Sequence, residues 1–286
     1  MAEQRAPDST FEDLVTEGAA VPTEGWDFSW FEGRATEARP SWGYARTAGG
    51  RLAHATAVLD IQTGGGEVFD FALGVAAAGS GPTDLSTDLG ATAPVTPHQP
   101  RLLVATEGWA PNVVKASGRL RARGVVVVAS AEDAPLPFAD GSFNLVLSRH
   151  PVRVHWAEIA RVLGPGGTYF AQHVGPASVF ELVEFFLGPQ PEPVRRGRHP
   201  DGERAAAEAA GLEVVGLRAE RLRMEFHDIA AVVHFLRKVV WMVPGFTVEA
   251  YEPQLRALHR RIETAGPFVA HSSRQLLDVR KPVRRP

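Results

Sequence analysis

A glycine-rich loop follows the first strongly apolar segment of the chain. Residues 57–61 have the pattern of a buried strand that ends beside Asp60, and the loop Gln62-Thr63-Gly64-Gly65-Gly66 comes directly after it. Glycines let a ligand approach the backbone closely, and exposed amides at a helix start favour an anionic group. A nicotinamide fingerprint would place a further glycine at Phe69, and a P-loop would end in Gly-Lys-Ser/Thr. The loop therefore predicts a ligand-binding turn of another kind, before a helix over about 67–78.

Acidic residues follow the next two predicted strands. Glu107, with Gly108 and Trp109 after it, ends the strand expected over 101–106, and Glu132 and Asp133 follow the strand expected over 124–129. A carboxylate at the end of a second strand can accept hydrogen bonds from both hydroxyls of a ribose. Glu107 could equally be a solvated loop acid. An acid after the third strand could accept an adenine amino group, so these positions together favour a nucleoside ligand.

Three histidines are candidates for proton transfer. His150 follows Ser148 and Arg149 at the end of the strand expected over 143–148 and is the first candidate for a general base, with His155 and His173 next. The alternative for each is a surface or core histidine whose ring bonds to a backbone carbonyl. His150 and His155 have no third ligand at a suitable spacing, so no metal site is expected.

The composition excludes several classes of function. The chain has 286 residues, a formal net charge of −3 and no cysteine. Without cysteine there is no disulfide framework, cysteine zinc site, iron–sulfur cluster or thiol nucleophile. The charge gives no global attraction to nucleic acid or anionic lipid. No apolar run approaches the ~20 residues of a membrane helix, and the first 30 residues do not resemble a signal peptide. We therefore expect a cytoplasmic protein.

Strands alternate with helices over most of the chain. This pattern implies parallel crossover units, and therefore an α/β fold with a doubly wound sheet whose ligands bind at the carboxyl ends of the strands. The last two strands, 212–226 and about 269–280, are expected to pair as neighbours. The other expected elements are helices at about 112–123, 155–163, 177–187 and 201–211, a strand at 168–174 and a turn at 165–167.

Three segments depart from this alternation. Residues 1–50 are expected to form an N-terminal arm or lid, frayed over 1–20, and residues 51–286 the main domain. The proline-rich segment 79–100 is expected to be a surface insertion, which would account for the long separation of Gly66 and Glu107. Amphipathic helices at 228–242 and 248–264 form a helical excursion, 228–264, that would cap the domain before the last strand.

Taken together, these segments resemble the class I S-adenosylmethionine-dependent methyltransferases. That family has an acid, a Gly-x-Gly-x-Gly loop, an acid ending the second strand, an acidic turn before Leu-Pro-Phe, and a helix running into Leu-x-Pro-Gly-Gly. The resemblance covers roughly 50–220 and the closing strand, and the flanking segments resemble uncharacterised bacterial members. The corresponding residues here are Asp60, Gly64, Gly66, Glu107, Glu132-Asp133, Leu136-Pro137-Phe138 and Arg161-Val162-Leu163-Gly164-Pro165-Gly166-Gly167.

The resemblance implies a Rossmann-like, mostly parallel sheet with an antiparallel last strand. It also implies the cofactor S-adenosylmethionine, with S-adenosylhomocysteine as product. Carried over by position, the methionine end would lie against Asp60 and the loop residues Gln62, Thr63, Gly64, Gly65 and Gly66. The ribose would lie against Glu107, Gly108 and Trp109, and the adenine amine against Glu132 or Asp133. Ser148, Arg149 and His150 would lie beside the sulfonium.

Three features depart from the family pattern. Gln62 replaces the first glycine of the loop, Asn144 replaces the aspartate of Phe-Asp, and the helix after the loop is short. Gln62 places a side chain where the loop turns most tightly. A protein that binds the cofactor without transferring its methyl group is therefore an alternative to an enzyme.

The expected activity is in-line methyl transfer to an oxygen, nitrogen or carbon atom of a small organic molecule. Aromatic residues between Trp26 and Tyr44 and the apolar residues of 228–245 would wall the acceptor site, or they are plain core. An RNA methyltransferase is a further alternative, because arginines cluster at 195–204, 256–261 and 280–285. Acids interleave with these arginines, so a solvated face is preferred and no nucleic-acid or membrane partner is expected. The sequence makes no prediction of the oligomeric state.

Overall fold

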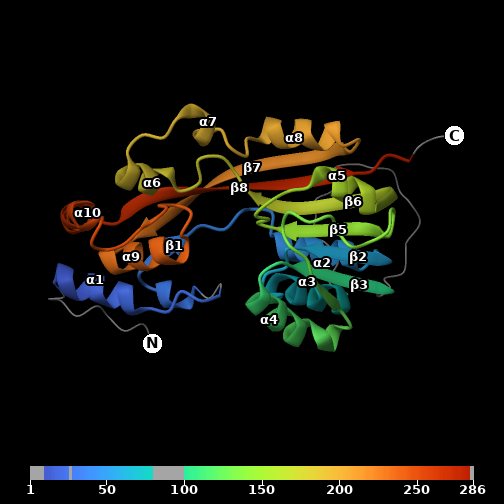
Figure 1. The fold of residues 1–286 in the computed structure, drawn as a ribbon, viewed down its shortest axis with the longest axis horizontal. Coiled ribbons are helices and arrows are strands. Elements are labelled where there is room, and N and C mark those ends of the chain that lie inside the picture. Colours follow the sequence, from blue (N-terminus) through green and yellow to red (C-terminus); the bar gives the residue numbers. More distant parts are fainter. Residues whose placement is uncertain (1–9, 26–27, 80–99, 284–286) are drawn as a thin grey trace. The chain divides into compact units, whose positions relative to one another are not determined.

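The computed structural model describes residues 10–25, 28–79 and 100–283 (Figure 1). Within them, eight strands are assigned to one sheet, in the order β1-β7-β8-β6-β5-β2-β3-β4. The strands are β1 (Ala35–Glu37), β2 (Ala57–Ile61), β3 (Leu102–Glu107), β4 (Val126–Ala129), β5 (Phe143–Arg149), β6 (Leu163–Val174), β7 (Glu213–Phe226) and β8 (Phe268–Arg280).

Most of the sheet is parallel. The pairs β3–β4, β2–β3, β2–β5 and β5–β6 are parallel, whereas β8 runs antiparallel to β6, and β1 runs antiparallel to β7. The expected α/β sheet, with its antiparallel last strand beside β7, is confirmed. The α-helices are α1 (Phe11–Ala20), α2 (Tyr44–Leu52), α3 (Glu67–Ala77), α4 (Ala110–Leu120), α5 (Trp156–Val162), α6 (Phe180–Leu187), α7 (Glu192–Arg195), α8 (Pro200–Ala209), α9 (Ile229–Lys238) and α10 (Glu252–Ala265).

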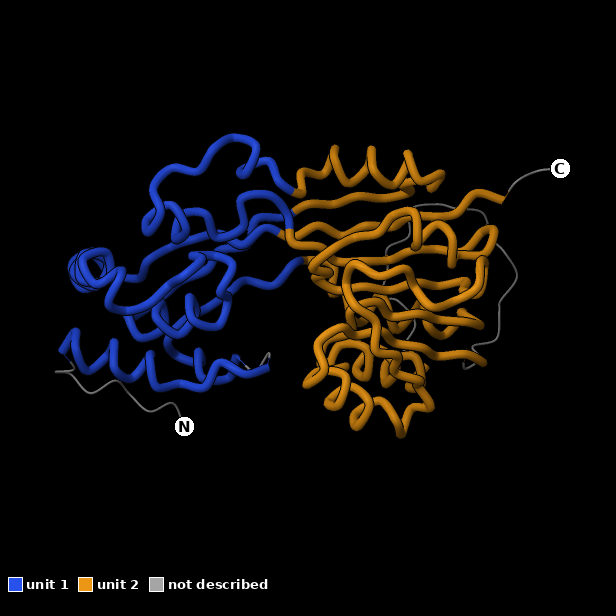
Figure 2. The backbone as a smooth tube through the Cα atoms, viewed as in Figure 1, with its two compact units in different colours: residues 1–40, 175–197, 220–273 blue, residues 41–174, 198–219, 274–286 orange. Residues whose placement is uncertain are grey.

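The chain divides into two compact units (Figure 2). Unit 1 comprises residues 1–40, 175–197 and 220–273, and unit 2 comprises residues 41–174, 198–219 and 274–286. The division expected from the sequence, an arm over 1–50 and a domain over 51–286 with a cap at 228–264, remains a prediction. The expected insertion at 79–100 also remains one, because residues 80–99 lie outside the described residues, as do Trp26 and Asp27.

Unit 2 is layered, with helices on both faces of its parallel strands. Successive strand residues point to opposite faces, so Val58 and Leu59 belong to different cores. Parallel strands covered on both faces are apolar throughout, as β2 and β5 are. On the face of Val58, buried residues of α2, α3 and α4 pack on the sheet, including Leu52, Phe69 and Leu120. On the face of Leu59, buried residues of α5 and α8 do so, including Trp156, Ile159 and Ala207.

Unit 1 has its own apolar core around α9. Nearly every residue of α9 is buried, and Leu14 and Val15 of α1 belong to the same cluster. The expectation that residues 1–20 are frayed is wrong for residues 10–20, which form a capped helix. Thr10 accepts from the backbone of Asp13, whose carboxylate accepts from Thr10 in return, so the two residues form a capping box.

The expected turn at Pro165–Gly167 is also wrong, because these residues continue β6. The N–H of Gly166 donates to the carbonyl of Lys281 (2.8 Å), and the N–H of Lys281 donates to the carbonyl of Gly167 (2.9 Å). Pairing with Lys281, directly after the antiparallel strand β8, keeps the segment in the sheet, with Gly166 at a positive φ of 77°. The extra residues are accommodated as a register shift opposite Phe143–Leu145.

The apolar residues at 228–245 do not all have the same surroundings. Phe235, Leu236 and Val239 are buried in the core of unit 1, whereas the side chains of Val240 and Trp241 are 60% and 59% exposed. Phe235, Leu236 and Val239 are therefore core residues, which was the alternative to a role in the acceptor site. Among the described residues, no helix combines the length and the apolar character that crossing a membrane requires.

Candidate functional site

The loop after β2 has the backbone conformation that its glycines predict. Gly64 and Gly66 have φ of 64° and 82°, and Gly66 is the residue before α3. A Cβ at Gly66 would meet the Leu120 side chain at 3.0 Å, so a larger residue there would be both strained and crowded. Gln62 has a positive φ as well, 56°, which is a conformation that a glycine adopts without cost. Gln62 therefore adopts a backbone conformation that the glycine expected there would also allow.

Glu107 joins the end of β3 to this loop. Its buried carboxylate accepts hydrogen bonds from the backbone N–H groups of Gly64 (2.8 Å), Gly108 (3.1 Å) and Trp109 (2.9 Å). Because β2 and β3 are parallel neighbours, their carboxyl ends lie at one edge of the sheet. Glu107 is therefore not a solvated loop acid. The indole of Trp109, beside it, is 48% exposed.

A second buried acid, Asp60, lies beside Glu107. The pKa of Asp60 is raised to about 7, mainly by burial; the nearby Thr63 hydroxyl lowers this pKa, and the negative charge of Glu107 raises it. That hydroxyl lies close enough to affect the pKa of Asp60, yet it is buried and makes no hydrogen bond of normal geometry with any described residue. The end of β2 thus carries a partly protonated acid and an unsatisfied hydroxyl, both of which favour a polar ligand.

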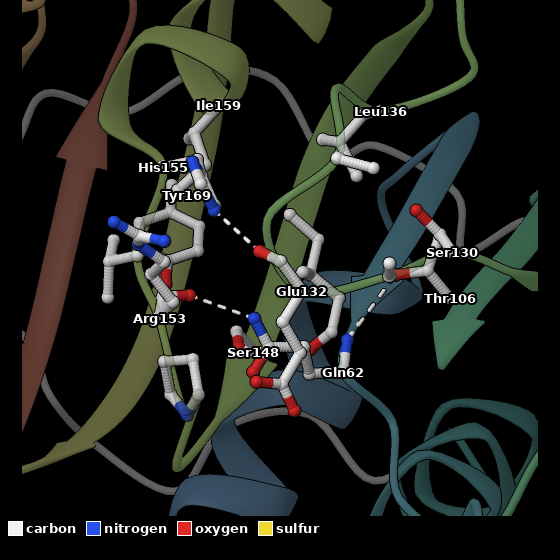
Figure 3. A pocket seen from close by; sticks show the side chains of 15 residues that line it. Gln62, Thr106, Ser130, Glu132, Leu136, Ser148, Arg153, His155, Ile159 and Tyr169 are labelled. Atoms are coloured by element: carbon white, nitrogen blue, oxygen red, sulfur yellow. Dashed lines mark hydrogen bonds between the residues drawn. The ribbon is translucent and has the colours of Figure 1, made fainter. Parts of the chain in front are cut away.

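A partly open pocket lies next to these residues, between the ends of β2, β3 and β5 and the segments 130–136 and 151–155 (Figure 3). Its volume is about 440 Å³, counted with its open mouth. Among the expected site residues, Gln62, Glu132, Ser148 and His155 line it. The residues that line it without having been predicted are Ile61, Thr106, Ser130, Ala131, Ala134, Leu136, Pro151, Arg153, Val154, Ile159 and Tyr169.

The other expected residues lie around this pocket without lining it. Glu107 and the glycine loop are joined by the hydrogen bond to Gly64, and Gly108 is close to Ser130, whose carbonyl oxygen lies 3.1 Å from a Cβ placed on Gly108. Asp133 and Arg149 are exposed. The structure therefore brings the strand-end residues of β2, β3 and β4 together. Sequence spacing alone does not show this proximity, because the three segments are distant in the chain.

The side chain of Gln62 crosses the pocket. Its Nε2 donates to the carbonyl of Arg153 (2.8 Å) (Figure 3). Its Oε1 accepts from the N–H of Val152 (2.6 Å). The ring of His155 makes a second connection, since its Nε2 donates to the carbonyl of Glu132 (2.6 Å). Both connections tie the loop after β5 to neighbouring strand ends. The ring of His155 is thus bonded to a backbone carbonyl. This is the environment expected from the sequence as the alternative to a general base.

A line of polar side chains, buried at Tyr169 and His173 and half-buried at Glu203, leads away from the pocket on the α8 side of the sheet. The Tyr169 hydroxyl lies 2.9 Å from His173 Nε2, and His173 Nδ1 lies 3.4 Å from a carboxylate oxygen of Glu203. Burial is the main cause that raises the pKa of Tyr169, so its hydroxyl stays protonated. Only His173 was a candidate from the sequence. Tyr169 lies in an apolar segment and Glu203 in an alanine-rich one, and no sequence pattern marks either residue.

His150 occupies a strained position at the end of β5. Its φ is 56°, its N–H donates to the carbonyl of Gln172 (2.7 Å), and its Nε2 lies 2.8 Å from Gln172 Nε2. Burial and the charges of Arg149 and Arg274 hold the pKa of His150 well below its usual range. His150 is therefore neutral near pH 7. Among the described residues, no group of three or more side chains has the arrangement of a metal site.

The comparisons with known proteins agree with this geometry. Residues 84–171 match the family model described as a methyltransferase domain. The biotin biosynthesis bifunctional protein BioHC of Teredinibacter turnerae is 29% identical over 141 residues, 46% of this chain and 24% of that protein. This chain thus spans about a quarter of the length of the curated relative that it matches.

Two solved structures show the same fold. A putative methyltransferase from Bacillus halodurans has a TM-score of 0.53 at 17% identity, over 82% of this chain and 95% of that one. The YcgJ protein of Bacillus subtilis has a TM-score of 0.51 at 16% identity, over 83% of this chain and 98% of that one. The matched methyltransferase domain and these two structures support the fold of a class I S-adenosylmethionine-dependent methyltransferase for this chain, with the glycine loop and its strand-end acid at one edge of the sheet.

Proposed function

We propose that this protein uses S-adenosylmethionine to methylate an oxygen, nitrogen or carbon atom of a small organic molecule, and releases S-adenosylhomocysteine. The observation that carries the proposal is the hydrogen bond between the Glu107 carboxylate and the N–H of Gly64, which joins the ends of β3 and β2. It sets a strand-end acid against a glycine loop at the edge of a parallel sheet, where such folds bind nucleosides.

The residues present fit this cofactor. Glu107 would bind the ribose hydroxyls, and the loop amides with Asp60 and the unsatisfied Thr63 hydroxyl would bind the methionine end. Glu132 or Asp133 would accept from the adenine amine, and Ser148, Arg149 and His150 would lie near the reacting centre. The cofactor supplies an activated methyl group. The task left to this chain is to bind and align both molecules, and alignment can lower the barrier by ~7–11 kcal/mol.

Ion pairs favour a small acceptor over RNA. Arg195 pairs with Glu184, Arg256 pairs with Glu12 and Glu252, and Arg280 pairs with Glu213. Arginines neutralised in this way contribute less to phosphate binding than free ones. The remaining alternative, a protein that binds the cofactor without transferring its methyl group, is favoured by one observation. The Gln62 side chain crosses the pocket and is hydrogen-bonded at both ends of its amide.

Calorimetric titration with S-adenosylmethionine and S-adenosylhomocysteine tests the proposal. We expect micromolar binding of both, and a loss of roughly tenfold or more for Glu107→Gln, because a charged acceptor becomes a neutral amide. Glu208→Gln, which changes an exposed acid on α8, is the matched control and should bind like the wild type.

Two outcomes would contradict parts of the proposal. Absence of binding in a folded sample would exclude the cofactor. Binding of both ligands, with no methyl transfer to any member of a panel of hydroxyl, amine and activated carbon acceptors, would favour the binding protein without transferase activity.

A further inference from the structure

Three side chains of unit 2 form a hydrogen-bonded line that ends at His150. The indole Nε1 of Trp42 donates to Gln172 Oε1 (2.7 Å), and Gln172 Nε2 lies 2.8 Å from His150 Nε2. Trp42 and Gln172 are buried, with 5% and 3% of their surfaces exposed. The line joins the segment before α2, the strand β6 and the end of β5, which are far apart in the sequence.

The chemistry of these groups fixes the direction of each hydrogen bond. An indole N–H can only donate, so the oxygen of the Gln172 amide must face Trp42 and its NH₂ must face His150. An NH₂ group can only donate, so His150 Nε2 must accept and carries no proton. A neutral imidazole with a bare Nε2 carries its proton on Nδ1.

The proton on Nδ1 is available to a ligand. Among the described residues, none makes a hydrogen bond to His150 Nδ1. The positive charges of Arg149, Arg274 and Arg198 act on the ring. Arg198 is held near it, because its guanidinium donates to the carbonyls of Pro151 and Val152. An N–H donor near the guanidinium of Arg198 is suited to an anionic oxygen.

We propose that Trp42 and Gln172 are positioning residues, which hold His150 with its proton on Nδ1 so that it donates a hydrogen bond to a carboxylate. The inference deepens the proposed function. The carboxylate belongs either to the acceptor substrate or to the methionine end of the cofactor. In either case His150 is a ligand-binding donor and not the general base expected from its place at the strand end, because its one basic nitrogen is occupied by Gln172.

Nitrogen NMR of the full-length protein labelled with ¹⁵N-histidine tests the tautomer without any ligand. The His150 signals are assigned by their loss in His150→Phe. We expect the wild type to show a protonated Nδ1 and an unprotonated Nε2. In Gln172→Glu a carboxylate faces Nε2, so the proton should move to Nε2. Trp42→Phe leaves the amide free to rotate and should give a mixture. A wild-type His150 protonated on Nε2 would overturn the proposal.

Ligand titrations locate the carboxylate. The probes are S-adenosylhomocysteine and 5′-methylthioadenosine, which lacks the amino-acid end. If the cofactor carries the carboxylate, His150→Phe should weaken binding of the first by roughly tenfold or more and leave the second unchanged. If the acceptor carries it, neither affinity changes, and acetate should shift the Nδ1 resonance of the wild type.

Other results of these titrations would overturn the proposal. Equal weakening of both probes would mean that His150 has only a structural role, and it would overturn the proposal. Unchanged affinities together with an unshifted Nδ1 resonance in acetate would also overturn it. Failure of the wild type to bind either probe would contradict the proposed function, whereas the tautomer of His150 would still be measured independently.

Discussion

Gln62 is the residue at which this chain departs most clearly from the methyltransferase pattern that its sequence resembles. A glycine at φ 56° would be unstrained and would leave the pocket clear, whereas the glutamine side chain crosses it and bonds to Val152 and Arg153. We expect Gln62→Gly to bind S-adenosylhomocysteine several-fold more tightly, because no side-chain hydrogen bonds must be broken first. Rapid-mixing fluorescence and calorimetry would measure the association rate and the affinity.

The matched control for this change is Gln62→Ala. Alanine removes the crossing amide but keeps a Cβ at a positive φ, so it should gain affinity while losing about 1 kcal/mol of stability relative to glycine. Weaker binding in both variants would show instead that the Gln62 amide contacts the cofactor. That result would make Gln62 a binding residue.

Asp60 gives the protein a pH dependence of known sign. Its pKa is about 7 in the folded protein, against about 3.9 in an unfolded chain. The folded state therefore holds a proton that the unfolded state has lost between about pH 4 and pH 7. Stability contributed by this group falls as the pH rises through that window. Three pKa units correspond to at most about 4 kcal/mol.

Asp60→Asn removes this titration. Urea unfolding at pH 5 and pH 8 should show that the wild type loses more stability than the variant between these two values. An equal loss in both proteins would contradict the raised pKa of Asp60. Comparing each protein with itself at two pH values cancels any constant cost of the substitution.

At the scale of elements, α1 shows how a helix depends on a cap and a core. Thr10 and Asp13 cap it, and Leu14 and Val15 are buried in the core of unit 1. We expect Thr10→Ala to lower the free energy of unfolding by about 1 kcal/mol, since it leaves an unsatisfied N–H at the helix start. Thr10→Ser keeps the hydroxyl and should be nearly neutral in the same urea titration. Equal stability of all three proteins would mean that the box contributes nothing.

Local sequence signals predicted most elements of unit 2. The helices α3, α4 and α5 and the strands β2, β3 and β5 lie within a few residues of their expected positions, because period and turn residues are local properties. The strand at 165–167 was missed because its place in the sheet depends on pairing with Lys281, more than a hundred positions away. Asn144 keeps an acceptor role, since its Oδ1 accepts from the N–H groups of Thr56 and Ala57.

At the scale of the whole molecule, the expected cofactor residues all belong to unit 2. We therefore expect S-adenosylhomocysteine to protect the amides of 62–66, 107–109 and 130–133 from hydrogen exchange. Binding to the native state also raises the melting temperature by mass action. In unit 1, α1 and α10 should show no direct protection. Hydrogen exchange followed by mass spectrometry measures both units at once, and protection confined to unit 1 would contradict the site assignment.

The sequence by itself determined the fold class, the alternation of strands and helices along the chain, and the acids at the ends of β2, β3 and β4. These follow from hydrophobic period, glycine and proline positions and residue order, which are local. Only the tertiary structure decided how side chains meet. It showed that Glu107 bonds to Gly64, that Gln62 bonds across to Arg153, and that Trp42, Gln172 and His150 form one hydrogen-bonded line. Those contacts join segments that the sheet brings together from distant parts of the chain. The local pattern of one segment does not predict which distant segment it will contact.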